Sequence, residues 1–230
     1  MNLELKKRFS NNFQFLASYT WSHSIDDSSD LQTLLKPQDN LNFRAERSDS
    51  LFDQRQRFVA TAIFGTPDSW SGDGGFKSFL HGFQFAPIVE VSSGRPFNIL
   101  AVGDANGDFQ STNERPNSIN GVLCQNLVDC PAGTSTFPAN GSLGRNFGIT
   151  HKFVSVDMRL SKKISFGERI KLDIIAEGFN MFNRFNEGAA NGDYRVVNAF
   201  KQRAKNGRYY SQSTAAFDPR QFQFGLKLSF

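Results

Sequence analysis

The clearest pattern in the chain is the alternation of apolar and polar positions at residues 220–230, RQFQFGLKLSF. A period of two places the apolar set on one face of a β-strand and the mostly polar set on the other. A terminal strand of this kind must bury its apolar face against a protein core or against lipid. The apolar positions of this terminal row are Phe222, Phe224, Leu226, Leu228 and Phe230.

Six further segments alternate in the same way and predict strands. Pro87 removes one backbone donor from its strand, so a bulge or locally weak pairing is expected there. Phe76, Phe79 and Leu80, which precede that strand, predict one short helical turn. The six segments are residues 2–8, 13–25, 57–64, 83–93, 153–163 and 169–179.

The connections between these seven strands alternate in length. Residues 26–54, 94–149 and 180–219 are long, polar and irregular, whereas the others are shorter and include a tight turn at 166–168. Long structureless stretches are unusual in compact soluble domains but ordinary in the outer loops of membrane barrels. The first strand then runs toward the short-turn, periplasmic side, and the C-terminus lies on that side.

Composition fits two kinds of β-sheet protein. Only 39% of the 230 residues are hydrophobic, yet 25 are Phe, and the mean hydropathy is −0.42. Both a barrel wall, in which alternate residues meet lipid, and a Phe-rich sandwich fit these values. No apolar run is long enough for a transmembrane helix. The N-terminal residues lack the apolar core of a signal peptide, so a protein of the outer membrane is expected to begin upstream.

Charged residues on the polar faces favour a membrane barrel over a sandwich core, where isolated charges are costly. We therefore predict an all-β, antiparallel up-and-down meander: a partial transmembrane outer-membrane β-barrel of about seven strands with long extracellular loops. A soluble, secreted β-sandwich that binds carbohydrate is the main alternative, and an envelope hydrolase and a small complete barrel are two others. The charges are Asp157, Arg159, Lys171, Asp173 and Glu177.

An ordered set of short motifs resembles the C-terminal part of the β-barrel of TonB-dependent outer-membrane receptors, especially the Oar-like group. The motifs are ASYTWSHSIDD (17–27), ERSDSLFDQRQRFV (46–59), SSGRPFN (92–98), DANGD (104–108) with NERPN (113–117), SLGRN (142–146), VDMRLSKKISF (156–166), AEGFNMFNRFN (176–186) and FQFGLKLSF (222–230). They cover nearly the whole chain in family order.

The resemblance implies a fragment of a larger receptor. Family members have about 22 strands around an N-terminal plug that contacts TonB. Residues 1–230 would form the C-terminal barrel segment without the plug, in the outer membrane of a Gram-negative-type bacterium. The implied function is TonB-dependent uptake of an oligosaccharide, a peptide or a metal chelate. The implied partners are outer-membrane lipid, TonB through the plug alone, and the barrel-assembly machinery, which would read Phe230 and its row.

Two short motifs are candidate sites. Cys124 and Cys130 lie in a polar stretch whose spacing allows a small disulfide loop, and two unpaired thiols are the alternative. Asp104, Asn106 and Asp108 have the one-three-five spacing of a calcium loop. However, Phe109 stands at the position of the usual glycine and Arg115 at that of the twelfth carboxylate. An ion site and a set of Asx turns are both open.

The remaining polar residues point away from catalysis and nucleic-acid binding. His23, His81 and His151 have no metal-binding spacing. No phosphate loop or nucleophile elbow is present, so we expect neither an enzyme nor a cofactor. The net charge is only +4 and the basic residues are scattered, which indicates no nucleic-acid partner. Glu46, Asp49, Asp53, Arg55 and Arg57 predict a salt-bridge cluster at the base of a loop.

Overall fold

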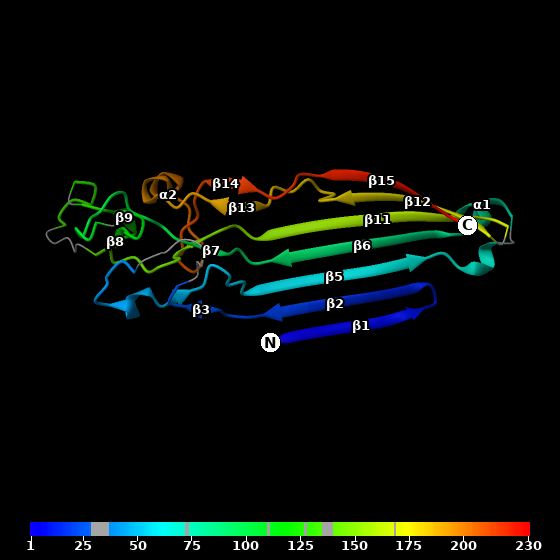
Figure 1. The fold of residues 1–230 in the computed structure, drawn as a ribbon, viewed down its shortest axis with the longest axis horizontal. Helices are drawn as coiled ribbons and strands as arrows, with labels where there is room; N and C mark the ends of the chain where they lie inside the picture. Colours follow the sequence, from blue (N-terminus) through cyan, green and yellow to red (C-terminus); the bar gives the residue numbers. More distant parts are fainter. Residues whose placement is uncertain (29–36, 72–73, 110, 127, 135–139, 168) are drawn as a thin grey trace.

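The long strands form one antiparallel sheet. The computed structural model describes residues 1–28, 37–71, 74–109, 111–126, 128–134, 140–167 and 169–230. Seven strands lie in chain order, each hydrogen-bonded to the next, and Figure 1 shows them side by side with the three long connections at one end. They are β1 (Asn2–Ser10), β2 (Phe13–Trp21), β5 (Gln56–Gly65), β6 (Phe83–Ser92), β11 (Phe153–Phe166), β12 (Ile170–Phe179) and β15 (Gln221–Ser229).

Six of the seven predicted strands agree with the observed ones to within three residues at either end. The predicted strand over 13–25 is present and begins at Phe13, but its predicted end was wrong, because β2 ends at Trp21. Beyond it the chain leaves the sheet, where the Ser24 N–H donates to Asp53 Oδ1 at 2.8 Å. Strand β11 continues to Phe166, and Glu168 of the predicted turn lies outside the described residues.

The strand register gathers the apolar positions on one face of the whole sheet. Aromatic rings reinforce this face: the Phe13 and Phe64 centroids lie 4.7 Å apart, and those of Phe64 and Phe85 lie 6.3 Å apart. Such cross-strand pairs stabilise a sheet directly. One row of paired positions that crosses six strands is Phe13, Phe64, Phe85, Leu160, Ala176 and Phe224.

This apolar face has no second protein layer over it among the described residues. On β15, Phe222 is 59% exposed, Phe224 79% and Leu226 75%. In a β-sandwich these side chains would be buried between two sheets. The architecture is therefore a single-layered meander, as predicted, and not the alternative sandwich.

The sequence predicted two features around β6: disturbed pairing at Pro87 and a short helical turn before the strand. The register between β5 and β6 is constant from Arg57 to Gly65, so there is no bulge. The pairing is interrupted at Ala62 and Ile63, which lie opposite the Pro87 region. The outcome is locally weak pairing. The predicted helical turn is α1 (Gly75–Leu80), preceded by the 3₁₀ helix η2 (Asp68–Ser71). In the part of the chain that the structure describes, no helix is long and apolar enough to cross a membrane.

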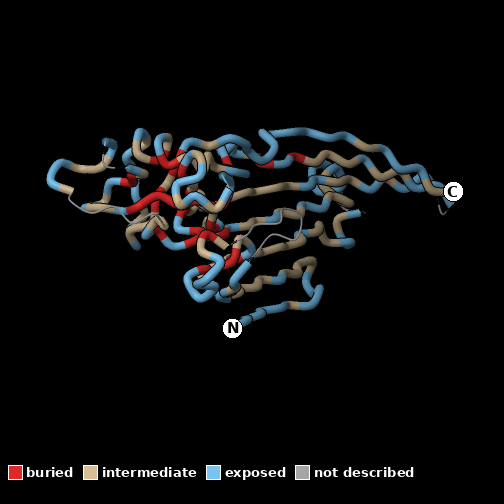
Figure 2. Tube along the Cα trace, turned by 60° about the vertical axis from the view of Figure 1, so that its left-hand side comes forward, coloured by how far each residue is buried: buried red, intermediate tan, exposed pale blue. Residues whose placement is uncertain are grey.

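Among the described residues, the three long connections are irregular along most of their length, as predicted, but they also contain short paired strands and helices that the sequence pattern did not predict. Their described residues (within 22–55, 93–152 and 180–220) pack together as one body, which we call the loop cap. Most buried residues lie there rather than in the sheet, as Figure 2 shows in red. The elements of the loop cap are β3 (Ile25–Asp26) paired with β4 (Ser48–Asp49), β7 (Pro96–Phe97) with β10 (Gly148–Ile149), β8 (Asn117–Ile119) with β9 (Val122–Cys124), β13 (Glu187–Ala190) with β14 (Ser213–Ala216), η1 (Phe43–Glu46) and α2 (Tyr194–Phe200).

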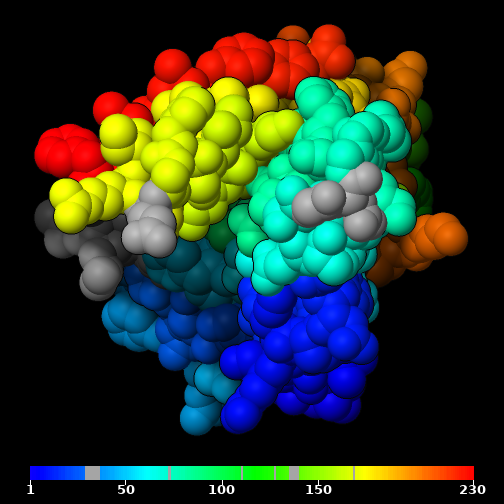
Figure 3. Space-filling view, turned by 90° about the vertical axis from the view of Figure 1, so that its right-hand side faces the viewer, coloured from blue at the N-terminus to red at the C-terminus, as the bar shows by residue number. Residues whose placement is uncertain are grey.

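The two outer strands of the sheet each have one neighbour in the described part of the chain. The order β1-β2-β5-β6-β11-β12-β15 has β1 at one edge and β15 at the other. Figure 3, viewed from the short-turn end, shows the same order as colours from blue at the bottom to red at the top. Six successive antiparallel pairings make β1 and β15 run in the same direction.

Candidate functional site

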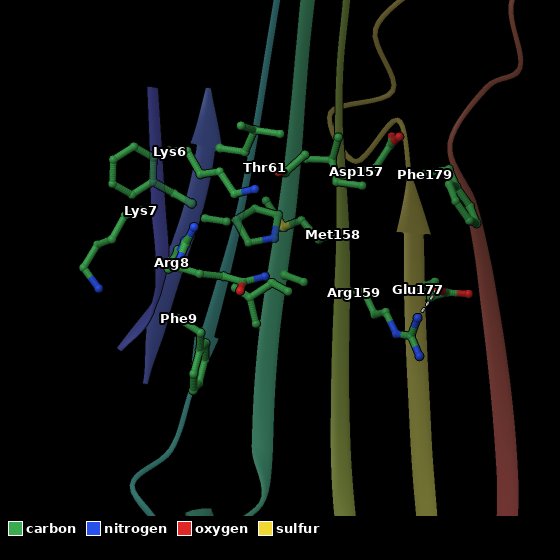
Figure 4. A pocket seen from close by; sticks show the side chains of 18 residues that line it. Lys6, Lys7, Arg8, Phe9, Thr61, Asp157, Met158, Arg159, Glu177 and Phe179 are labelled. Atoms are coloured by element: carbon green, nitrogen blue, oxygen red, sulfur yellow. Dashed lines mark ion pairs between the residues drawn. The ribbon is translucent and has the colours of Figure 1, made fainter. Parts of the chain in front are cut away.

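The face opposite the apolar row carries the charged side chains among apolar ones such as Leu16 and Ile88, and forms a shallow cavity of about 560 Å³ (Figure 4). Pairing of β11 with β12 sets Arg159 opposite Glu177, and Nη1 and Oε1 of this pair lie 3.7 Å apart. Lys6 and Arg8 line the cavity from β1. The alternation of the strands thus places charges on a face separate from the apolar one, as the sequence predicted.

A second cavity, also of about 560 Å³, lies where the polar face meets the loop cap. An ion pair and a histidine–carboxylate hydrogen bond line it: Arg57 Nε is 2.8 Å from Glu90 Oε1, and His151 Nδ1 is 3.0 Å from Glu187 Oε2. The exposed Arg95 adds a further positive charge to the lining. Aromatic rings also line it, from Phe97, Phe153 and Phe217. A cavity with both charge signs and aromatic surfaces suits an organic ligand with polar groups.

The loop cap has its own apolar core. Helix α2 places Val197 and Tyr194 against residues of the second long connection, and Val197 is 1% exposed. Asp193 caps the helix by accepting a hydrogen bond from the Arg195 N–H, which fixes where α2 begins. The core consists of Ile99, Leu123, Leu143, Tyr194, Val197 and Tyr209, with Phe97 packed against it. Phe97 also lines the second cavity, so this core lies next to it.

A buried ion pair joins the first long connection to the second. Arg115 donates from both terminal nitrogens to the Glu46 carboxylate, at 2.8 and 2.9 Å. Its Nε donates to the Leu143 carbonyl at 3.0 Å, and the Gln38 N–H donates to Glu46 Oε1 at 3.0 Å. A bidentate pair with further partners recovers much of the cost of burying both charges. This pair is therefore structural.

Asp49 joins the first long connection to the third. Its carboxylate lies 2.8 Å from His23 Nε2, 3.0 Å from Arg55 Nη2 and 2.9 Å from Arg208 Nη1. Burial raises the pKa of Asp49, but the His23 hydrogen bond and the two guanidinium charges outweigh burial, so the pKa lies below its usual value. Asp53 binds Arg55 at 2.7 Å, so three of the five predicted residues, Asp49, Asp53 and Arg55, do form a salt-bridge cluster. The prediction was wrong for the other two, because Glu46 pairs with Arg115 and Arg57 pairs with Glu90.

The candidate calcium motif forms a compact turn in the loop cap. Asp104 accepts backbone hydrogen bonds from Gly107 at 2.6 Å and Phe109 at 2.8 Å. Asn106 accepts one from the Asp108 N–H at 3.0 Å. These are the bonds expected of Asx turns. Asp104 and Asp108 also lie within 4.8 Å of a third carboxylate, Glu114, which the spacing did not single out.

The remaining residues that the sequence singled out lie either in the loop cap or at the short-turn end of the sheet. Cys124 and Cys130 form a disulfide bond next to the core of the loop cap. The terminal row ends at Phe230, which is 98% exposed at the short-turn end of the sheet. His23 and His151 lie in the loop cap and His81 lies at the other end, so the three histidines do not meet.

Sequence reasoning did not identify Glu114, Arg115, Arg145 and Arg208 as structural or functional residues. Arg145 pairs with Asp26 and donates to the Glu46 carbonyl at 2.8 Å. The carboxylate partners of the three arginines are 69 to 159 residues away in sequence, so no local spacing reveals them. The only available sign was the presence of charged residues inside the NERPN and SLGRN motifs.

Comparison with known proteins agrees with this architecture. A family model described as an outer membrane beta barrel domain matches residues 1–223. No curated protein and no solved structure shows a significant match. The matched residues include six of the seven strands in full and all of the loop cap. By this match, and by its antiparallel meander with one apolar and one polar face, the chain belongs to the family of outer membrane β-barrel domains, located in the outer membrane.

Proposed function

We propose that this chain is one part of the wall of a larger outer-membrane receptor that takes up its substrate in a TonB-dependent way. The observation that carries the proposal is the direction of the two edge strands. Strands β1 and β15 run the same way, so pairing them would produce a parallel contact in an otherwise antiparallel sheet. Barrels of bacterial outer membranes are antiparallel and have an even number of strands. Further strands therefore complete the wall.

The second cavity is the proposed substrate site. It lies between the polar face, which lines the lumen in a barrel, and the loop cap, which lies on the extracellular side. Its charged groups and aromatic rings suit an oligosaccharide, a peptide or a metal chelate, since each class combines polar groups with flat or apolar surface. The proposal assigns binding and passage to this chain, without catalysis.

The proposed partners follow from the apolar face of the sheet and from its C-terminal row. The apolar face contacts lipid, and the exposed row that ends at Phe230 is presented to the barrel-assembly machinery. TonB acts through a plug domain supplied outside residues 1–230. The resemblance of the short motifs to TonB-dependent receptors supports this assignment.

Uptake by intact cells tests the proposal. The probes are a labelled oligosaccharide, a labelled oligopeptide and a ferric catecholate chelate. We expect accumulation of one probe to fall to the same low level in cells that lack this protein and in cells that lack TonB. We expect Arg95→Ala, which removes a charge from the second cavity, to reduce uptake of that probe. Arg195→Ala, an exposed arginine of the loop cap outside that cavity, is the matched control.

Two results would contradict the proposal. If removal of the protein leaves all three probes unaffected, the chain does not transport these classes. If uptake requires the protein but not TonB, the chain forms a passive pore. If Arg95→Ala and Arg195→Ala reduce uptake equally, the second cavity is not the substrate site. The proposed transport function would not be affected by that result.

A further inference from the structure

Three carboxylates of the second long connection converge in the loop cap. Asp104, Asp108 and Glu114 each offer an oxygen, and these oxygens lie within 4.8 Å of one another. Asp104 is exposed, whereas Glu114 is fully buried. Three like charges at this separation repel one another, and burial of one of them strengthens the repulsion.

The Glu114 carboxylate is also buried without hydrogen bonds within the described ranges, which is a feature independent of the charge repulsion. Both of its carboxylate oxygens are buried without a hydrogen-bond partner among the described residues. Its neighbour Asn113 is also buried, and Asn113 Oδ1 is likewise without a partner there. The Asn113 amide nitrogen lies 3.5 Å from Asp108 Oδ2, so this side chain borders the same cluster. Buried acceptors without donors are costly, and a bound cation removes that cost.

We propose that Asp104, Asp108 and Glu114 bind one Ca²⁺ ion. The set contains only oxygen atoms, which hard cations prefer. Calcium accepts six to eight oxygens in flexible geometry, whereas Mg²⁺ requires a near-ideal octahedron. A site assembled from one turn and a residue beyond it suits the more tolerant ion. Asn106 is not a ligand, because its amide nitrogen donates to the Gln38 carbonyl at 2.8 Å and its oxygen accepts from Asp108.

The ion ties the exposed turn to the centre of the loop cap. Glu114 is followed by Arg115, which forms the buried pair with Glu46. The Glu114 carbonyl also accepts from the Ala101 N–H at 2.9 Å, next to the apolar core. An ion held by Asp104 and Glu114 therefore links the turn to both the polar and the apolar contacts of the loop cap.

The test uses the full chain, purified in a non-ionic detergent free of lipopolysaccharide, with Ca²⁺ alone as the probe. Equilibrium dialysis against ⁴⁵Ca²⁺ is expected to give one ion per chain, half-saturated at about 10⁻⁴–10⁻³ M, the range of extracellular calcium modules. We expect Glu114→Gln and Asp108→Asn each to weaken binding at least tenfold. Asp68→Asn, an exposed carboxylate at the short-turn end, is expected to bind like the wild type.

Thermal unfolding in EDTA shows whether Glu114→Gln binds Ca²⁺ weakly because a metal-binding side chain is missing or because the variant is less stably folded. Without an ion, Glu114→Gln removes a repelled buried charge, so its unfolding temperature is expected to equal or exceed that of the wild type. Added Ca²⁺ is expected to raise the unfolding temperature of the wild type and not that of the variant. The proposal is overturned by absent saturable binding in the wild type, by undiminished binding in Glu114→Gln, or by a variant that unfolds earlier than the wild type in EDTA.

Discussion

Two buried glutamates of the loop cap have opposite environments. Glu46 accepts three hydrogen bonds, two of them from the Arg115 guanidinium and one from the Gln38 N–H. Glu114 is equally inaccessible, yet has no donor among the described residues and faces Asp104 and Asp108. Burial and these two charges together raise the pKa of Glu114 to about 7. Glu46 therefore joins two segments of the loop cap, whereas the burial of Glu114 without donors from the described chain costs folding free energy.

The raised pKa predicts how stability depends on pH in the absence of Ca²⁺. Between about pH 4.5 and 7 the folded chain keeps the Glu114 proton that the unfolded chain releases. Stability therefore falls as pH rises through this window. Thermal unfolding in EDTA across this range is expected to show the fall in the wild type and a smaller one in Glu114→Gln. Identical profiles for the two proteins would refute the role of Glu114.

Spacing alone points to Asp104 and Asp108 but not to the complete cluster. The standard calcium loop directs attention to its twelfth position, which is Arg115 here, whereas the carboxylate stands one residue earlier. What places Glu114 in the cluster is the fold of the turn, including the positive φ angles of Gly107 and Phe109. Local sequence does not encode this path in any simple periodicity.

The strands were predictable because each one shows the alternation of apolar and polar residues within its own sequence. Alternation along β15 or β12 is a local property, and it also sets the register through the need to gather apolar residues on one face. The loop cap has no such period. Its buried pairs, such as Glu46 with Arg115 and Asp49 with Arg208, join positions 69 and 159 residues apart. Elements made by contacts of this kind appear irregular until their partners are known.

Strand β15 provides a test of the two faces. Leu226 lies near the middle of the strand on the apolar face, and Gln223 lies on the polar face. We expect Leu226→Lys to cost about 2–4 kcal/mol of folding free energy, the penalty for a lysine near the bilayer midplane. Gln223→Lys, the same new side chain on the other face, is expected to have little effect. Urea unfolding in lipid vesicles measures both, and equal costs would contradict the assignment of the faces.

At the scale of the whole molecule, the chain consists of two differently stabilised parts. The sheet depends on ladder hydrogen bonds and on the solvent that surrounds its apolar face, and few of its residues are buried. The loop cap depends on an apolar core, a disulfide and buried ion pairs. Secreted and extracellular proteins use disulfides in the same oxidising surroundings. The two parts should therefore respond separately to mutation.

A pair of leucine substitutions tests this separation. Leu123 is fully buried in the core of the loop cap, whereas Leu41 in the same body is 96% exposed. Leu123→Ala is expected to destabilise the loop cap by about 2–5 kcal/mol, and Leu41→Ala by less than about 0.5 kcal/mol. Proteinase K cleavage of the loop cap in isolated outer membranes measures the difference. The heat-resistant, folded form of the sheet should persist in both variants, and its loss in Leu123→Ala would mean that the two parts fold as one.

The shared direction of β1 and β15 also limits how copies of this chain assemble. Two copies inserted the same way across a bilayer would supply fourteen strands, a permitted even total, yet each seam would join parallel edges. A homodimer ring is therefore excluded by direction although its parity is correct. Only a complement that begins and ends with strands of the opposite sense, and so contains an odd number of them, closes this wall with antiparallel hydrogen bonds throughout.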